Sequence, residues 1–340
     1  MEHDLLYVSV GITLCFAFVN GFHDGGNVIA TIVGSRAMHP YRALLLATAA
    51  EFIGPLVIGT SVAGSIFGIF KPAEMSKVSA GVISLMVISA SLGAILWKLP
   101  SWFLGLPSSS SHAILSGLAG AALVAMGREG IDLDKMLKGV ALPLVLSPIV
   151  GVVLGYLCFG IVRSMAAHAD RSIGHFFVAV QKPLMAVLAA SQGSNDAQKS
   201  MGLIALVLLA HGGSGQTPEH LPFGVMAACA AALAAGVAAG GLRIVKAVGY
   251  DLYRMQPVHS FVSLLTSTSV VAGASFLGGP VSTTQVVGAS VVGVGASRRL
   301  SGVRWASARN IGYAWFVTVP VCAALSAALF LVLKRCFVPG

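Results

Sequence analysis

The sequence reads NGFHD at residues 20–24, and a related stretch, QGSND, follows at residues 192–196, 172 positions later. A second motif also occurs twice: PSSSSH occupies residues 107–112, and PVSTTQ occupies residues 280–285, 173 positions later. Because two different motifs return with nearly the same offset, the chain of 340 residues contains an internal duplication. Polar motifs at matching positions of duplicated apolar halves are typical of secondary transporters, in which they mark the binding site.

The composition predicts a polytopic membrane protein. Hydrophobic residues make up 56% of the chain and charged residues 10%, and the mean hydropathy is +0.87. A water-soluble domain could not cover its surface with so few charges. Several uncharged stretches are long enough to cross a bilayer as a helix, including Val78–Trp97, Gly139–Val162 and Asn310–Leu333.

The net charge of +9 does not indicate a nucleic-acid partner. In a membrane protein, an excess of lysine and arginine reflects the bias of basic residues toward the cytoplasmic side. The five cysteines are scattered, form no metal-binding spacing and are interpreted as packing residues. We expect membrane lipid as the surroundings of the protein and no cofactor.

Apolar segments indicate about five crossings in each half. The predicted spans are Leu5–Ser35, Ala43–Phe70, Val78–Trp97, Ser108–Met126 and Gly139–Val162, then Pro183–Ala210, Leu221–Leu242, Pro257–Leu277, Pro280–Ala296 and Asn310–Leu333. Because five is an odd number, the second half enters the membrane from the opposite side, which makes the repeat inverted. A re-entrant hairpin could replace one or more of these crossings. The expected organisation is a first repeat at 1–165, a cytoplasmic connector at 166–182 and a second, inverted repeat at 183–340.

The distribution of basic residues predicts that both termini lie outside. With this orientation, 13 lysines and arginines are inside and 7 are outside, and Lys199 remains within a membrane motif. The residues counted as inside are Arg36, Arg42, Lys98, Arg163, Arg171, Lys182, Arg243, Lys246, Arg254, Arg298, Arg299, Arg304 and Arg309.

Three acidic residues lie deep in apolar sequence, namely Asp24, Glu51 and Asp196. A charge at the centre of a membrane helix costs about 2.5–3.5 kcal/mol, so such residues generally face a cavity and serve an ion, a proton or a partner. Asp24 and Asp196 occupy matching repeat positions, which favours a role in transport over a structural pair satisfied by the local backbone or by Lys199. Glu51 has no acidic counterpart, because Phe223 stands at the matching position, and a structural role remains open for it.

Glycine, asparagine and glutamine surround both aspartates. We expect broken or re-entrant helices at these motifs and at the PSSSSH and PVSTTQ motifs. A broken span exposes N–H groups, which suit an oxyanion, and carbonyl groups, which suit a cation. Oxygen ligands from Asn20, Asp24, Asn195 and Asp196 suit Na⁺. Coupling-ion candidates are therefore Asn20, Asp24, Glu51, Asn195 and Asp196, with Na⁺ possible at Asp24 and Asp196.

The two hydroxyl-rich motifs each follow a proline and precede a helix of small residues. Such helix starts direct several N–H and O–H donors toward one point. The candidate oxyanion donors are Ser109, Ser110, Ser111, Ser282, Thr283 and Thr284. His112 and its counterpart Gln285 could carry a proton, contact the anion or simply pack.

Acids and anion donors in one site imply a second ligand. Two carboxylates that face a cavity repel an anion, and Lys199 supplies one positive charge. The remaining positive charge must arrive with the substrate, as Na⁺, as H⁺ on a carboxylate or as a chelated metal. This combination indicates symport of an anion with a cation.

The chain resembles the inorganic phosphate transporter (PiT) family at these motifs. Residues 20–38, NGFHDGGNVIATIVGSRAM, are similar to the first signature of that family, and residues 193–202, GSNDAQKSMG, to the second. PSSSSH and PVSTTQ resemble its paired hydroxyl motifs. The resemblance implies an inverted repeat, outside termini and a possible homodimer.

The resemblance also implies residue roles. Carried over by motif, Asp24, Asn27, Asn195 and Asp196 contact the cation and phosphate, and Glu51 matches an acidic position of the family. The six hydroxyl residues become phosphate donors. Gln285 departs from the family pattern, in which histidine is frequent at this place, and the long central hydrophilic region of many members is absent.

These observations predict a bacterial inner-membrane symporter that imports inorganic phosphate with Na⁺ or H⁺ by alternating access, and not an enzyme. One alternative is a permease for sulfate or another tetrahedral oxyanion, although protonatable groups near the anion favour phosphate. A passive channel is a further alternative. An intramembrane serine hydrolase would need one asymmetric nucleophile–base site, whereas this chain offers two matched half-sites.

Overall fold

The computed structural model describes residues 2–167, 172–213, 217–240 and 245–337, and their regular structure is helical. The predicted all-α class is therefore confirmed for these residues. The main helices are α1 (Glu2–Gly34), α2 (Pro40–Val57), α3 (Ser61–Phe67), α5 (Ala80–Phe103), α6 (Ser110–Met126), α8 (Leu142–Ala166), α9 (Ile173–Ala210), α10 (Phe223–Gly240), α12 (Pro257–Phe276), α13 (Thr283–Arg298) and α14 (Trp305–Phe337). Short helices are α4 (Pro72–Met75), α7 (Leu133–Lys135) and α11 (Val245–Gly249).

Fewer helices can cross a membrane than the sequence predicts. Among the described residues, seven helices are long and apolar enough, or eight if α2 and α3, which meet at a bend of 69°, form one span. Helices α6 and α13 have 17 and 16 residues, whereas a spanning helix needs about 20. Ten complete crossings is therefore too high a number, because two of the predicted crossings are short helices that begin inside the protein.

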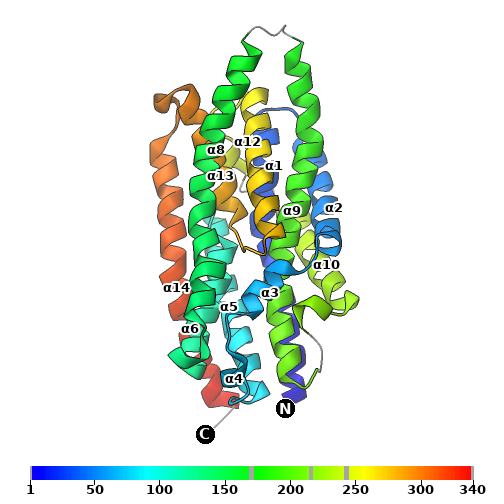
Figure 1. Ribbon diagram of the computed structural model, residues 1–340, viewed down its shortest axis with the longest axis vertical. Helices are drawn as coiled ribbons and strands as arrows, with labels where there is room; N and C mark the ends of the chain where they lie inside the picture. Colours follow the sequence, from blue (N-terminus) through cyan, green and yellow to red (C-terminus); the bar gives the residue numbers. More distant parts are fainter. Residues whose placement is uncertain (1, 168–171, 214–216, 241–244, 338–340) are drawn as a thin grey trace.

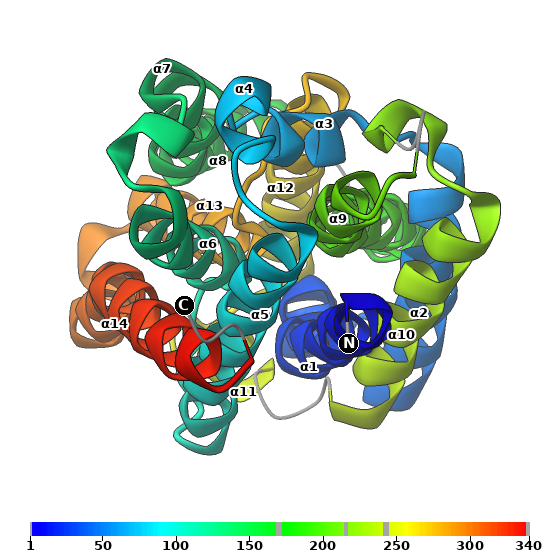
Figure 2. The same ribbon diagram turned by 90° about the horizontal axis from the view of Figure 1, so that it is seen from below.

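Each of these short helices forms a hairpin with the helix before it. Figure 1 shows α5 and α6 at the end of the molecule where both described chain ends lie, and α12 and α13 reaching in from the opposite end. The two hairpins meet, since the Ser111 Oγ donates a hydrogen bond of 2.7 Å to the carbonyl of Val281. In the view from below, α1, α5 and α9 lie side by side between α14 and the pair α2 and α10 (Figure 2).

The hydroxyl motifs fix where α6 and α13 begin. Ser109 caps α6 by accepting a hydrogen bond from the His112 N–H at 3.2 Å, and Ser282 caps α13 by accepting from the Gln285 N–H at 3.4 Å. Serine at such a position satisfies a helix N–H group that has no partner within the helix. The two caps stand 173 positions apart, which is the offset of the motif itself.

The expectation of broken helices at the two aspartate motifs is wrong. Helix α1 continues through residues 20–24, and α9 continues through residues 192–196. Their glycines serve close packing instead: a Cβ atom at Gly21 would collide with the Leu233 carbonyl of α10, and one at Gly193 would lie 2.5 Å from the Glu51 carbonyl. Small residues let membrane helices approach closely in this way.

A break does occur between α2 and α3, and a side chain of α9 stabilises it. The Gln198 Oε1 accepts hydrogen bonds from the N–H groups of Val62 at 2.7 Å and Ala63 at 3.3 Å. These N–H groups belong to the first turn of α3 and would otherwise be buried without partners.

Some sequence predictions concern the loops. Helix α9 begins at Ile173, within the predicted connector 166–182. Residues 168–171 and 241–244, which include Arg171 and Arg243 of the topology prediction, lie outside the described residues.

Substitution of Gly21 by alanine should destabilise the protein. The added methyl group collides with the backbone of α10, and overpacking of this kind typically costs about 1–3 kcal/mol. Gly11 provides a matched control on the same helix, because a Cβ atom there meets nothing within 4 Å. We expect G21A to lower the melting temperature of the detergent-purified protein and G11A to leave it unchanged or raise it. Equal melting temperatures for the two variants would contradict the close contact of α1 and α10.

Candidate functional site

Asp24 lies on α1 at the centre of a buried polar network. Its Oδ2 accepts from the Lys98 ammonium group at 2.8 Å, and its Oδ1 accepts from the His23 Nδ1 at 2.7 Å. Lys98 Nζ also donates to the Asn20 Oδ1 at 3.1 Å. The other ring nitrogen of His23 lies 3.1 Å from Ser101 Oγ, so the network reaches the tip of the α5–α6 hairpin.

Lys98 is a member of this buried network that the sequence interpretation places wrongly. The topology prediction assigns it to the inside, beyond the end of a span, but α5 continues to Phe103 and the Lys98 side chain is fully buried. Since a buried ammonium group needs a partner, its contact with Asp24 is the physical reason for its position. The only signal in the sequence is a single lysine within an otherwise apolar helical stretch.

Asp196 is paired with a lysine of its own helix. The Lys199 ammonium group donates to the Asp196 Oδ1, and both side chains are buried on α9. The contact with Lys199 that the structural alternative names is therefore present at Asp196. Each aspartate motif thus holds one buried carboxylate and one buried ammonium group.

Asn195 holds the tip of the α12–α13 hairpin. Its Nδ2 donates to Ser275 Oγ at 3.2 Å and to the Gly279 carbonyl at 3.3 Å, while its Oδ1 accepts from the Val281 N–H at 3.3 Å. His23 makes the corresponding contacts in the first half, where its Nε2 lies 3.3 Å from Ser108 Oγ.

The hydroxyl motif of the second half reaches the aspartate motif of the first. Thr284 Oγ1 accepts from the Asn27 Nδ2 at 2.7 Å and donates to the Asp24 Oδ1 at 3.4 Å. Thr283 and Ser110 are also buried, and Thr283 Oγ1 has no hydrogen-bond partner among the described residues. The hydroxyls of Ser109, Ser111 and Ser282 are engaged in the helix caps and in the contact between the hairpins.

His112 and Gln285 face each other across the two hairpins. The Gln285 Nε2 lies 3.4 Å from the His112 Nδ1, and this ring nitrogen lies 2.7 Å from Ser109 Oγ. The two residues occupy matching positions of the motifs, so their contact joins the first turns of α6 and α13.

Glu51 connects to the same network through Gln192. The Gln192 Nε2 donates to the Glu51 Oε1 at 3.2 Å and to the Asp24 carbonyl at 3.4 Å. The Glu51 side chain is fully buried. Its second oxygen, Oε2, is buried and has no hydrogen-bond partner among the described residues.

All four motifs therefore converge on one enclosed polar region. Asp24 and Asp196 are each 2% exposed, and the hydroxyl residues of both motifs are buried around them. Among the described residues, buried polar atoms that lack partners include Asn20 Nδ2, Asn27 Oδ1, Glu51 Oε2, Gln192 Oε1 and Thr283 Oγ1. Buried polar atoms without partners are costly in a folded protein, which marks them as groups available to a ligand.

Comparison with known proteins assigns the chain to a family. The profile of the phosphate transporter family matches residues 20–326. The chain belongs to the phosphate transporter family. It is 36% identical to a probable low-affinity inorganic phosphate transporter of Bacillus subtilis over 98% of this chain and 99% of the relative, and 38% identical to one of Rhizobium meliloti over 96% of each.

A solved structure described as the sodium-dependent phosphate transporter has the same fold. The TM-score is 0.88 at 25% sequence identity, and the match covers 98% of this chain and 99% of that one. The predicted resemblance is thus confirmed: the chain is a multi-pass membrane protein and a phosphate transporter, not an enzyme. The hydrolase alternative is excluded by this membership.

Removal of the Lys98 ammonium group should destabilise the protein strongly. In K98M the Asp24 carboxylate remains buried without its main partner, and breaking such a pair costs about 3–5 kcal/mol. The double variant D24N/K98M should recover much of this loss, because no buried charge is left unpaired. Lys77, whose side chain is 66% exposed beside Glu74, gives the control K77M with little effect. The free energy of unfolding of the purified protein, measured for K98M, D24N/K98M and K77M against the wild type, checks these expectations. If K98M is destabilised no more than K77M, the Lys98–Asp24 ion pair does not stabilise the fold as proposed.

Proposed function

We propose that this transporter imports inorganic phosphate across a bacterial plasma membrane by symport with a cation, through alternating access. The observation that carries the proposal is the contact of Thr284 with both Asn27 and Asp24. It joins an anion-donor motif of one half to an acidic motif of the other in a single buried site. A site of this kind requires both halves and can hold an anion and a cation together.

Residues 1–165 and 183–340 act in this proposal as inverted repeats with outside termini. Three matched features support it: the serine caps, the tip contacts of His23 and Asn195, and the facing pair His112 and Gln285. The opposite directions of the two hairpins in Figure 1 add further support. Rocking of the halves would then expose the region between the tips alternately to each side.

Phosphate is proposed to bind between the two hairpin tips. The first turns of α6 and α13 present N–H groups there, as helix starts do for oxyanions. Ser110 and Thr283, one on each tip, are buried and follow directly after the serines that cap the two helices, so their hydroxyls are the proposed principal donors. Lys98 and Lys199 supply positive charge near the anion. Ser109, Ser111, Ser282, Asn195 and Thr284 shape this region and complete the proposed set.

The lysines also bear on the coupling ion. Sodium at Asp24 or Asp196 would have to share these carboxylates with the ammonium groups of Lys98 and Lys199. Because a lysine ammonium group already neutralises each aspartate, we propose that the driving cation binds at Glu51. This carboxyl group has a free buried oxygen and no ammonium partner among the described residues.

We propose a proton as that cation. A carboxyl group enclosed without a positive partner is most stable in its neutral form, and a protonated Glu51 adds no charge to a site that receives an anion. Phosphate then enters a site in which the two aspartates are paired with lysines and Glu51 carries no charge. Sodium at Glu51 and the aspartates is the competing assignment, in keeping with the sodium dependence of the transporter that shares this fold.

Uptake of labelled phosphate into proteoliposomes tests the coupling. We expect accumulation with an inward proton gradient in the absence of sodium. Accumulation driven by a sodium gradient alone would contradict the proton proposal, and uptake that never exceeds equilibration under either gradient would indicate a passive channel. Competition by excess sulfate in the same assay would show whether other tetrahedral oxyanions share the site.

Substitutions of the acids test the assignment of residues. We expect D24N to abolish concentrative uptake and E51Q to uncouple it from the proton gradient while phosphate exchange between equilibrated compartments continues. Asp134 is a matched control, because its carboxylate is 70% exposed and pairs with Lys138 at the surface. D134N should therefore transport normally. Full proton-driven uptake by E51Q would remove Glu51 from the mechanism.

A further inference from the structure

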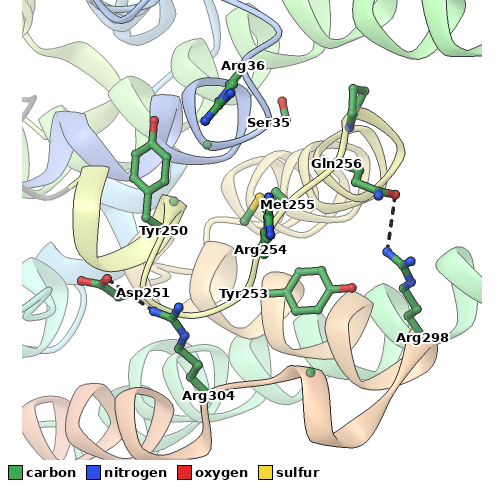
Figure 3. A pocket seen from close by; sticks show the side chains of 14 residues that line it. Ser35, Arg36, Tyr250, Asp251, Tyr253, Arg254, Met255, Gln256, Arg298 and Arg304 are labelled. Atoms are coloured by element: carbon green, nitrogen blue, oxygen red, sulfur yellow. Dashed lines mark hydrogen bonds and ion pairs between the residues drawn. The ribbon is translucent and has the colours of Figure 1, made fainter.

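A second polar cavity lies at the end of the molecule opposite the chain ends. It has a volume of about 920 Å³ and is formed by the loop after α1, the segment from α11 to α12, and the segment from the end of α13 to the start of α14 (Figure 3). Gly34, where α1 meets the cavity, is ten residues beyond Asp24, which corresponds to about 15 Å along the helix. The cavity is therefore separate from the site between the hairpin tips.

The lining of this cavity is strongly basic. Four arginines, Arg36, Arg254, Arg298 and Arg304, surround it, and Asp251 is the one acidic residue among the described residues of the lining. Arg304 lies 3.8 Å from Asp251, and Arg298 lies 3.4 Å from the Gln256 Oε1 and 3.5 Å from the His259 ring. No hydrogen bond or ion pair within the described part of the chain engages the guanidinium groups of Arg36 and Arg254. An excess of positive charge with two unengaged guanidinium groups suits a multivalent anion.

The left-handed backbone conformation of Arg36 indicates that its side chain has a function. Arg36 has φ 62°, the only positive φ of a non-glycine residue in the described ranges. It ends α1 in the position where helices usually have glycine, as the bonds from Arg36 N to Val33 O and from Ala37 N to Ile32 O show. An arginine there is conformationally unfavourable. A basic group near the end of a helix also gains from the helix dipole, but neighbouring positions offer this gain without a left-handed backbone.

The size of the cavity and its tyrosines indicate the class of ligand. A volume of about 920 Å³ is in the range of sites for small organic molecules and far exceeds the needs of one phosphate ion. Tyr250 and Tyr253 line the same cavity beside the arginines, and the Tyr250 side chain is partly exposed. One guanidinium group can donate two parallel hydrogen bonds to the oxygens of a phosphate group. An exposed aromatic ring can stack on a planar base. The cavity lies beyond the last turn of α1 and before the first turn of α12, on the aqueous side of these apolar helices.

We propose that this cavity binds a soluble ligand with two or more phosphate groups, of the nucleoside polyphosphate class, and that its occupancy slows transport. The second part rests on the proposed function. The cavity joins the end of α1, which carries Asp24, to the start of α12 and the end of α13, which form the second hairpin. A ligand that bridges these segments holds the two halves in one arrangement, so it opposes the movement that transport requires.

Direct binding to the purified full chain tests the site without any gradient. In nanodiscs of zwitterionic lipid, calorimetric titration with pyrophosphate and with ATP should give saturable binding, tighter than for orthophosphate. R36G/R254Q should weaken this binding at least tenfold. The control R128Q changes an exposed arginine at the opposite end and should bind normally. Absence of binding, equal affinity for orthophosphate, or unchanged binding in R36G/R254Q overturns the site.

R36G separates ligand binding from a structural role of the arginine. Because glycine relieves the left-handed backbone, this variant should keep or raise the melting temperature while it binds pyrophosphate more weakly. A lower melting temperature for R36G would overturn the argument that the arginine is retained for a ligand. Displacement of pyrophosphate by cardiolipin in the nanodisc would assign the site to a lipid headgroup and overturn the soluble ligand.

Uptake measurements then test the regulatory part. Pyrophosphate on both sides of the vesicle membrane should slow phosphate uptake by the wild type and leave R36G/R254Q unaffected. Equal inhibition of both proteins, or none of the wild type, overturns the link to transport while the binding site stands. If no protein takes up phosphate, the proposed function fails, and the titration still decides the site.

Discussion

The structure depends on the neutralisation of buried carboxylates by buried lysines. Asp24 and Asp196 lie on the two long helices α1 and α9, and each would be very costly inside a membrane protein without an opposite charge. Lys98 reaches Asp24 from the α5–α6 hairpin, so one ion pair also fixes how the hairpin lies against α1. Lys199 neutralises Asp196 from within the same helix, α9. The duplicated halves thus meet one physical constraint in two different ways.

The hairpin tips are held by polar contacts rather than by apolar packing alone. His23 and Asn195 bind the tips of their own halves, while Thr284 and Ser111 link each tip to the other half. Within a membrane, backbone that leaves the helix must find partners inside the protein. The side chains that form hydrogen bonds with the hairpin tips also surround the candidate site. The same polar groups are therefore available to stabilise the fold and to contact a ligand.

The duplicated motifs, the two hydroxyl helix starts and the central acids could be predicted from the sequence, because these depend on local residue type and spacing. The role of Lys98 as a partner of Asp24 could not, since an ion pair across 74 residues leaves no local pattern. Glycine near Asp24 suggested a broken helix, whereas the structure uses Gly21 for contact with α10. The true break, between α2 and α3, depends on Gln198 from a distant helix and therefore has no local signal.

The two carboxylate–lysine pairs have an electrical consequence. A carrier whose empty site moved two uncompensated carboxylates would feel the membrane potential at about 2.3 kcal/mol per charge for every 100 mV. Here each carboxylate is paired with an ammonium group, so the two pairs would add no net charge to such a displacement. In the proposed cycle the charge of the empty site is therefore that of Glu51 alone, which is a carboxylate once it has released its proton, and the membrane potential acts on the return of the site through this one charge.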